Sequence, residues 1–245
     1  FIKCTSTKYL LTDIDTTKQI SPLFENLGNL NFTISTENER VQAFFNQGIK
    51  LSYAFNHAEG HRSFLEVARL SPNTAMAYWG QAFALGPNIN DPMPDDERKQ
   101  KINEAMVKAK QFSSRATAKE RALIKALSAR YSEDLTKDVA DLNMAYMEAM
   151  TKVVEQFPED ANIQILYAAS VMNTVPWNYW DKDGNPSPNI KEAKIALETA
   201  MKIEPENPGG HHYYIHMVEL PYPDMGVESA DKLASLMPGA GHIVH

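Results

Sequence analysis

The sequence predicts an all-α protein, a right-handed solenoid of about five stacked helix pairs preceded by a short N-terminal arm. The first observation is a stripe of apolar residues, placed eight and five positions before each of four prolines. These prolines are Pro72, Pro158, Pro205 and Pro238. The stripe consists of Phe64, Met150, Leu197 and Ala230, then Val67, Val153, Ala200 and Leu233. Such spacing marks one face of a helix that ends at a proline, because proline cannot continue it.

The second observation is that a new helical segment follows each proline. The segments read NTAMAYWGQAFAL, EDANIQILYAASVM, ENPGGHHYYIHMVE and GAGHIVH. Asp and Asn near these starts supply the side-chain oxygens that cap helix N-termini. Each proline therefore separates the second helix of one pair from the first helix of the next.

A third column of the repeat is small in three cases out of four. Gly60, Ala193 and Gly226 stand twelve positions before their prolines, and Tyr146 breaks the column. We expect the two helices of a pair to approach closely at Gly60 and Ala193. The bulk of Tyr146 puts the same contact in doubt for its own pair.

The helix pairs are expected near 39–70, 74–112, 117–157, 160–203 and 207–236. The 86 residues from Pro72 to Pro158 hold two units, with intermediate helices in DDERKQKINEAMVKAKQF and ATAKERALIKALSARY. A further helix begins near Gly239 and is cut after His245. We therefore expect the array, residues 39–245, to be truncated at its C-terminal end.

The truncation has an expected consequence at the C-terminal end. Its last flank would be a bare apolar surface that includes Tyr213, Met217 and Leu233, unless more chain or an assembly contact covers it. At the other end, residues 1–38 lie outside the repeat. Their stretch NLNFTIST alternates in polarity and predicts one short strand or an extended arm on the first helix pair.

Composition excludes several classes of protein. The net charge of −7 and the absence of a basic stripe argue against a nucleic-acid groove. No apolar run reaches the roughly 20 residues of a transmembrane helix. The single Cys4 excludes an internal disulfide. The opening FIKCTSTK is similar to the end of a lipoprotein signal, but we take this as accidental because three residues precede Cys4. The compartment stays open, with an exported or periplasmic location favoured over a cytoplasmic one.

Several long motifs extend over residues 40–245. They are FNQGIKLSYAFNHAEGHRSFLEVARLSP, AMAYWGQAFALGPNIN, PWNYWDKDGNPSPN and HHYYIHMVE…PGAGHIVH. This pattern resembles the tetratricopeptide repeat (TPR) proteins, and in particular one bacterial group of them. The resemblance implies a helical array with a concave binding groove, and no reaction. The first unit departs from the family pattern at Phe44, Phe45 and Gln47, and the third departs at Tyr146.

Long polar loops predict a binding edge. In a stacked array every turn from first to second helix emerges on one edge, and here those turns include FNHAEG, GPNINDPMPDD, TVPWNYWDKDGNPSPN and ELPYPDM. The alternative is that these loops only cap helix ends. We expect His57 to order its loop as a hydrogen-bond donor, far from the C-terminal histidines. The candidate binding residues are Asn56, His57, Asn88, Asn90, Trp177, Trp180 and Tyr213.

One of these loops has partial calcium-loop spacing, at Asp181, Asp183, Asn185 and Glu192. Pro186 occupies the position where a calcium loop needs glycine for its sharp turn. We therefore interpret DKDGNPSPNIKE as a plain polar turn.

Five of the seven histidines lie in the last 35 residues. His212 and His216 are four apart on one helical face, whereas His211 points about 100° away. His245 repeats the place of His212, because each lies seven residues after its proline. If these helices line one groove, His212, His216, His242 and His245 are candidate ligands for Zn²⁺ or Cu²⁺, with Glu219 or Tyr213 as nearby oxygen ligands. The alternative is that they are ordinary aromatic and polar residues lining a groove.

Two functions from different classes follow. The sequence favours a scaffold that binds a protein or peptide partner through its concave groove and loop edge. The second hypothesis is a histidine-rich Zn or Cu protein. Catalysis is the less favoured outcome, because the chain has no His-Glu-x-x-His motif, no nucleophile arrangement and no Gly-rich phosphate loop.

Overall fold

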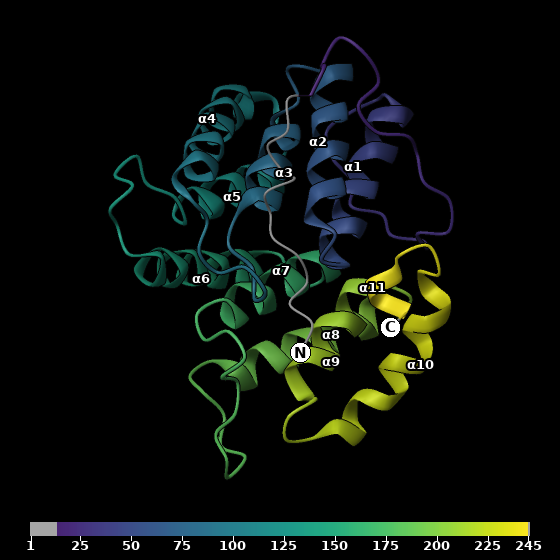
Figure 1. The fold of residues 1–245 in the computed structure, drawn as a ribbon, viewed down its shortest axis with the longest axis vertical. Coiled ribbons are helices and arrows are strands. Elements are labelled where there is room, and N and C mark those ends of the chain that lie inside the picture. The colour runs from purple at the N-terminus through teal and green to yellow at the C-terminus, as the bar shows by residue number, and fades with distance from the viewer. Residues whose placement is uncertain (1–13, 245) are drawn as a thin grey trace.

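The computed structural model describes residues 14–244, and over this range the chain is helical without a β-strand (Figure 1). The α-helices are α1 Glu39–Tyr53, α2 His57–Leu70, α3 Ala75–Leu85, α4 Asp96–Phe112, α5 Ala118–Ser128, α6 Val139–Gln156, α7 Ala161–Met172, α8 Ile190–Ile203, α9 Pro208–Val218, α10 Val227–Leu236 and α11 Gly241–Val244. Two short 3₁₀ turns, η2 Ser113–Arg115 and η3 Pro223–Gly226, join them. The expected helix positions are confirmed, and most helices pack mainly against their neighbours in the chain.

Residues 14–38 form an irregular arm along α1, with no strand in NLNFTIST. Backbone N–H groups of the arm donate to side-chain oxygens of α1, at 2.7 Å for Phe24 to Gln47 and 3.0 Å for Phe32 to Asn46. The buried Gln47 also donates to the carbonyl oxygen of Pro22 at 2.8 Å. A polar residue stands at this helix position because the arm needs a hydrogen-bond partner there. The motif FIKCTSTK lies outside the described residues.

Glycines allow the first three helices to approach closely around Phe64. A Cβ added at Gly48 of α1 would lie 2.5 Å from the Phe64 ring, and one at Gly80 of α3 would lie 2.3 Å from it. A Cβ at Gly60 of α2 would lie 3.1 Å from the Gly48 carbonyl oxygen, which confirms the close approach expected at Gly60. Phe64 itself is fully buried. The small residues are therefore set by the packing between helices, not by the backbone conformation.

Tyr146 occupies the position where a small residue was expected, and its ring is accommodated beside Arg130. The side chain is buried in α6, and the guanidinium of Arg130 lies 4.9 Å from its ring centroid. Burial raises the pKa of the Tyr146 hydroxyl, so it is neutral at ordinary pH. An aromatic ring in contact with a cation thus stands where Gly60, Ala193 and Gly226 stand in the corresponding column of the sequence.

The C-terminal helices pack against α1 and the arm, which corrects the expectation of a bare C-terminal flank. Tyr213 of α9 packs edge-on against Tyr53 of α1, with ring centroids 6.1 Å apart. Figure 1 shows the yellow C-terminal helices beside the end of α1. A second apolar cluster joins the arm, α1 and the C-terminal helices, and consists of Leu27, Leu51, Ala54, Leu233, Met237, Ala240 and Ile243. The chain therefore covers Tyr213, Met217 and Leu233 itself, and all three are buried.

None of the helices within residues 14–244 combines the length and the apolar character that crossing a bilayer requires.

We expect the protein to lose stability as pH falls below 6.5, partly through His61. Burial in α2 lowers the pKa of His61 from 6.5 to about 4, with a smaller contribution from Arg62. Between pH 6.5 and 4 the unfolded chain is protonated at His61 and the folded chain is not. The free energy of unfolding therefore falls as the pH is lowered through this range. We expect His61 alone to lower the free energy of unfolding by about 1 kcal/mol for each pH unit in this range.

Urea unfolding of the wild type and of His61→Gln at pH 7.5, 6.5 and 5.5 measures this contribution. Glutamine does not titrate, so the variant should show a shallower decline than the wild type. Equal slopes in the two proteins would show that His61 is not protonated on unfolding.

Candidate metal centre

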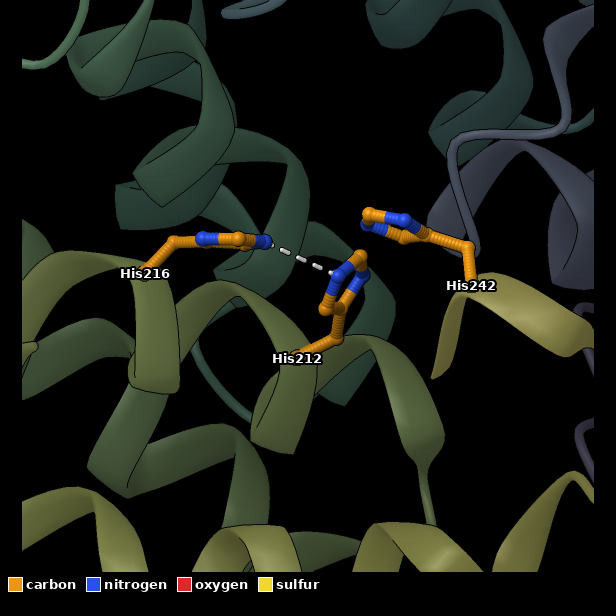
Figure 2. Close-up of side chains that lie close together, drawn as sticks. All are labelled: His212, His216 and His242. Atoms are coloured by element: carbon orange, nitrogen blue, oxygen red, sulfur yellow. Dashed lines mark hydrogen bonds between the residues drawn. The ribbon is translucent and has the colours of Figure 1, made fainter. Parts of the chain in front are cut away.

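Three histidines from two helices converge beside the C-terminal end of α1. His212 and His216 lie one turn apart on α9, and His242 lies on the short α11. One ring nitrogen of each lies within 4.8 Å of the others, and Figure 2 shows the imidazoles turned toward a common point. The predicted grouping of these three residues is therefore confirmed. His245 lies outside the described residues.

Hydrogen bonding fixes the protonation of His212. Its Nδ1–H donates to the backbone carbonyl oxygen of Tyr53 at 2.5 Å, and this oxygen can only accept. Burial, followed by the nearby His216, holds the pKa of His212 well below 6.5, so the ring is neutral. Its Nε2 then carries a lone pair, and metal-binding histidines are commonly oriented in this way.

His216 has the complementary arrangement. Its Nδ1 lies 3.3 Å from the Glu219 carboxylate, and its Nε2 lies 3.1 Å from Nε2 of His212. When His216 carries its proton on Nε2, that N–H donates to the lone pair on Nε2 of His212, as the dashed line in Figure 2 marks. When the proton is on Nδ1, directed at Glu219, both Nε2 atoms present lone pairs to the space between the rings. Two imidazole nitrogens bound to one tetrahedral zinc lie about 3.3 Å apart, so the second arrangement fits two ligands of one ion.

The two oxygen ligands expected near the histidines take other roles. Glu219 contacts the outer nitrogen of His216, so it orients the ring from behind. Tyr213 is buried with its ring edge-on to Tyr53 and Phe55. Burial raises the pKa of the Tyr213 hydroxyl, which disfavours the phenolate needed for metal binding.

Phe55 is the residue at this site that the sequence did not indicate. Its ring centroid lies 4.4 Å from that of His212, 5.4 Å from His216 and 5.5 Å from His242. Trp177 adds a second wall, edge-on to His216 at 5.5 Å. These rings give the histidines an apolar environment, which strengthens interactions between an ion and its ligands.

Phe55 and Trp177 both have an unusual backbone conformation. Phe55 has φ of 56° and Trp177 has φ of 65°, a left-handed conformation that costs bulky residues about 1–2 kcal/mol each. The Trp177 indole N–H donates to the carbonyl oxygen of Ile89 at 2.7 Å, which holds the residue in place. Strain of this kind concentrates at ligand sites, where the surroundings over-determine the geometry.

His57 corrects two expectations. It stacks on Phe55 with ring centroids 6.1 Å apart, so it lies beside the C-terminal histidines and not far from them. It also orders no loop as a donor, because both ring nitrogens are buried without a partner among the described residues. Burial is the main cause that lowers its pKa to about 4. His57 was expected to lie far from these histidines because it is distant from them in the sequence. The packing of α1 against α9 brings them together.

The remaining loop residues mostly hold the fold. Asn56 caps α2, and the Asn88 side chain accepts from the backbone N–H groups of Asn90 and Asp91. The Trp180 indole donates to the Met217 carbonyl oxygen at 2.7 Å. Asn90 is exposed. Of the loop residues proposed for binding, Trp177 and His57 are the ones placed at the histidine cluster.

The DKDGNPSPNIKE loop is a self-contained polar turn. The Asp181 carboxylate accepts from the backbone N–H groups of Asp183 and Asn185, at 2.8 and 2.9 Å. Glu192 lies in the first turn of α8. Asp181 is therefore occupied by the turn itself.

His211 has a structural role that matches its different helical face. Its ring nitrogens lie 3.0 Å from Ser229 Oγ and 2.9 Å from the Pro205 carbonyl oxygen. Both partners lie in neighbouring parts of the array, so His211 ties α9 to α10 and to the preceding turn.

Comparison with known proteins finds no matching family model, no similar curated protein and no similar solved structure. The TPR resemblance therefore stays a prediction.

Proposed function

We propose that this protein binds one Zn²⁺ or Cu²⁺ ion through His212, His216 and His242. The observation that carries the proposal is the pair of Nε2 atoms of His212 and His216, 3.1 Å apart, each ring hydrogen-bonded through its other nitrogen. Neutral imidazoles are good ligands for both metals. Three protein ligands leave a position for water or a further ligand.

The metal would also stabilise the fold by linking α9 and α11 beside the end of α1. His242 lies on α11, His212 and His216 lie on α9, and His212 is anchored to the end of α1. An ion shared by these residues fastens the two ends of the chain together. We propose that the whole is a TPR-like right-handed solenoid whose ends are joined at the metal centre.

Binding is proposed here without a catalysed reaction. A hydrolytic zinc site needs a general base within reach of the metal-bound water. Glu219 is turned to the outer nitrogen of His216, and His57 has a strongly lowered pKa. The described side chains at the centre are therefore suited to holding an ion in an apolar pocket.

Elemental analysis of protein purified without chelator tests the proposal, with titration of metal-stripped protein by Zn²⁺ or Cu²⁺. We expect one ion per chain and a rise in melting temperature, since an ion at a thousandfold its Kd adds about 4 kcal/mol of stability. A chain that takes up neither metal, with an unchanged melting temperature, contradicts the proposal.

The scaffold function remains a second proposal, favoured by apolar side chains exposed on the long loops. Met93 is 67% exposed, Leu220 is 76% exposed, and Trp177 and Tyr222 are also exposed. These loops belong to the edge that the sequence proposed for a protein or peptide partner. Selection of peptides on the immobilised protein, repeated with Met93→Ser/Leu220→Ser, tests it. Unchanged peptide binding by the double variant would contradict a role for this edge.

A further inference from the structure

Several buried polar groups other than the three histidines have no partner among residues 14–244. These atoms are both ring nitrogens of His57, Nη2 of Arg130, Oδ1 of Asn173 and the hydroxyl of Tyr179. All four residues belong to turns or helix ends between the first and second helices of a pair. Buried polar atoms in folded proteins are nearly always hydrogen-bonded to protein, water or a bound molecule, so each of these atoms requires a partner.

Arg130 is the most informative of these residues. It is 2% exposed, and no carboxylate among the described residues forms an ion pair with it. Its Nε donates to Asn143 Oδ1 at 2.9 Å, and its guanidinium lies over the Tyr146 ring. A buried charge without a counterion costs several kcal/mol, even with these contacts. An anion bound beside Arg130 would offset this cost.

Asn143 connects Arg130 to a second unsatisfied group. Its Nδ2 donates to the Asn173 carbonyl oxygen at 3.2 Å, which places Asn173 one side chain away from the guanidinium. The Asn173 amide orientation is fixed, because Nδ2 donates to the Ala169 carbonyl oxygen at 2.8 Å. Oδ1 of Asn173 is left as a buried acceptor. A ligand that carries a hydrogen-bond donor would satisfy it.

His57 adds hydrogen-bonding capacity without a second charge. Its pKa is lowered to about 4 mainly by burial, and also by the positive charges of Arg98 and Arg130. The neutral ring offers one donor and one acceptor. The charge of Arg130 is therefore matched by a single negative charge.

We propose that Arg130, His57 and Asn173 form a binding site for a small monocarboxylate that carries a neighbouring hydroxyl or ammonium group. The carboxylate pairs with the planar guanidinium, for which its geometry is well matched. The hydroxyl or ammonium donates to Asn173 Oδ1. A phosphate dianion suits the site poorly, because it brings a second negative charge into a buried position, in a chain of net charge −7.

The site does not depend on the metal, so it is tested on the full chain both as purified and with phenanthroline, a chelator without a carboxylate. Melting temperature is measured with lactate, alanine, propionate and inorganic phosphate. We expect lactate or alanine to raise it most, propionate to raise it less because it lacks the donor, and phosphate to leave it unchanged. Stabilisation by phosphate alone, or by none of the four, overturns the proposal.

Arg130→Met gives a readout that separates ligand binding from folding. Removing a buried unpaired charge should keep or raise the melting temperature of the ligand-free protein, while affinity for lactate or alanine falls at least about tenfold. Arg115→Met, at an exposed arginine, is the matched control and should bind like the wild type. Equal affinity in Arg130→Met and Arg115→Met shows that Arg130 does not hold the carboxylate.

Discussion

Replacing His216 by alanine is expected to weaken Zn²⁺ or Cu²⁺ binding by more than about a hundredfold. The loss of a residue that only orients a ligand already costs 10–100-fold in affinity. His216 itself supplies one of the three nitrogens that lie within 4.8 Å of one another. Competition with a chelating dye at fixed pH measures the change in Kd.

Two further variants make the His216 result specific. His211→Gln on the same helix removes an imidazole whose partners are Ser229 and Pro205, so it should lower stability and leave metal affinity unchanged. Glu219→Gln should give an intermediate loss, because it weakens the orientation of His216 without removing a ligand. If His216→Ala binds the metal as tightly as His211→Gln does, the three histidines are not the site.

The helices could be predicted from the sequence because their signals are local. The stripe before each proline and the caps after it lie within one or two turns. Asp160 and Asn207 cap α7 and α9 as expected, whereas the α3 N-cap residue, Thr74, makes no side-chain capping bond. The pairing of His212 with His216 is local for the same reason, since residues four apart share a helical face. Helices, their caps and residue pairs four apart depend on a few neighbouring residues, so they can be predicted from those residues.

The closure of the array could not be predicted in the same way. It depends on contacts between residues far apart in the sequence, such as those of α1 with α9, and no short motif encodes them. The consequence is that Tyr53, Phe55 and His57, at the first turn, stand beside histidines more than 150 positions later. Phe55 carried no signal, because an aromatic residue in a turn is ordinary until the structure shows what it touches. The covered C-terminal flank was missed for the same reason.

Gly209→Ala is expected to destabilise the protein by about 3 kcal/mol, at the upper end of the usual cost of overpacking. A Cβ at Gly209 of α9 would lie 2.4 Å from the ring of Tyr53 on α1. That ring is fully buried and is held edge-on by Tyr213, so it has little room to move. Alanine in place of glycine within a helix ordinarily adds up to about 1 kcal/mol of stability. A net loss therefore isolates the contact between the two ends of the chain.

The same substitution should weaken metal binding, although residue 209 is not a ligand. The Tyr53 carbonyl oxygen accepts the Nδ1–H of His212, so displacing Tyr53 loosens the orientation of that imidazole. Urea unfolding and dye competition on one preparation measure both effects, with Gly226→Ala as control. An added Cβ at Gly226 makes ordinary contact at 3.5 Å and should change neither quantity. A Gly209→Ala protein as stable as the control would mean that α1 and α9 do not pack tightly. One that is destabilised but keeps full metal affinity would mean that Tyr53 does not position His212.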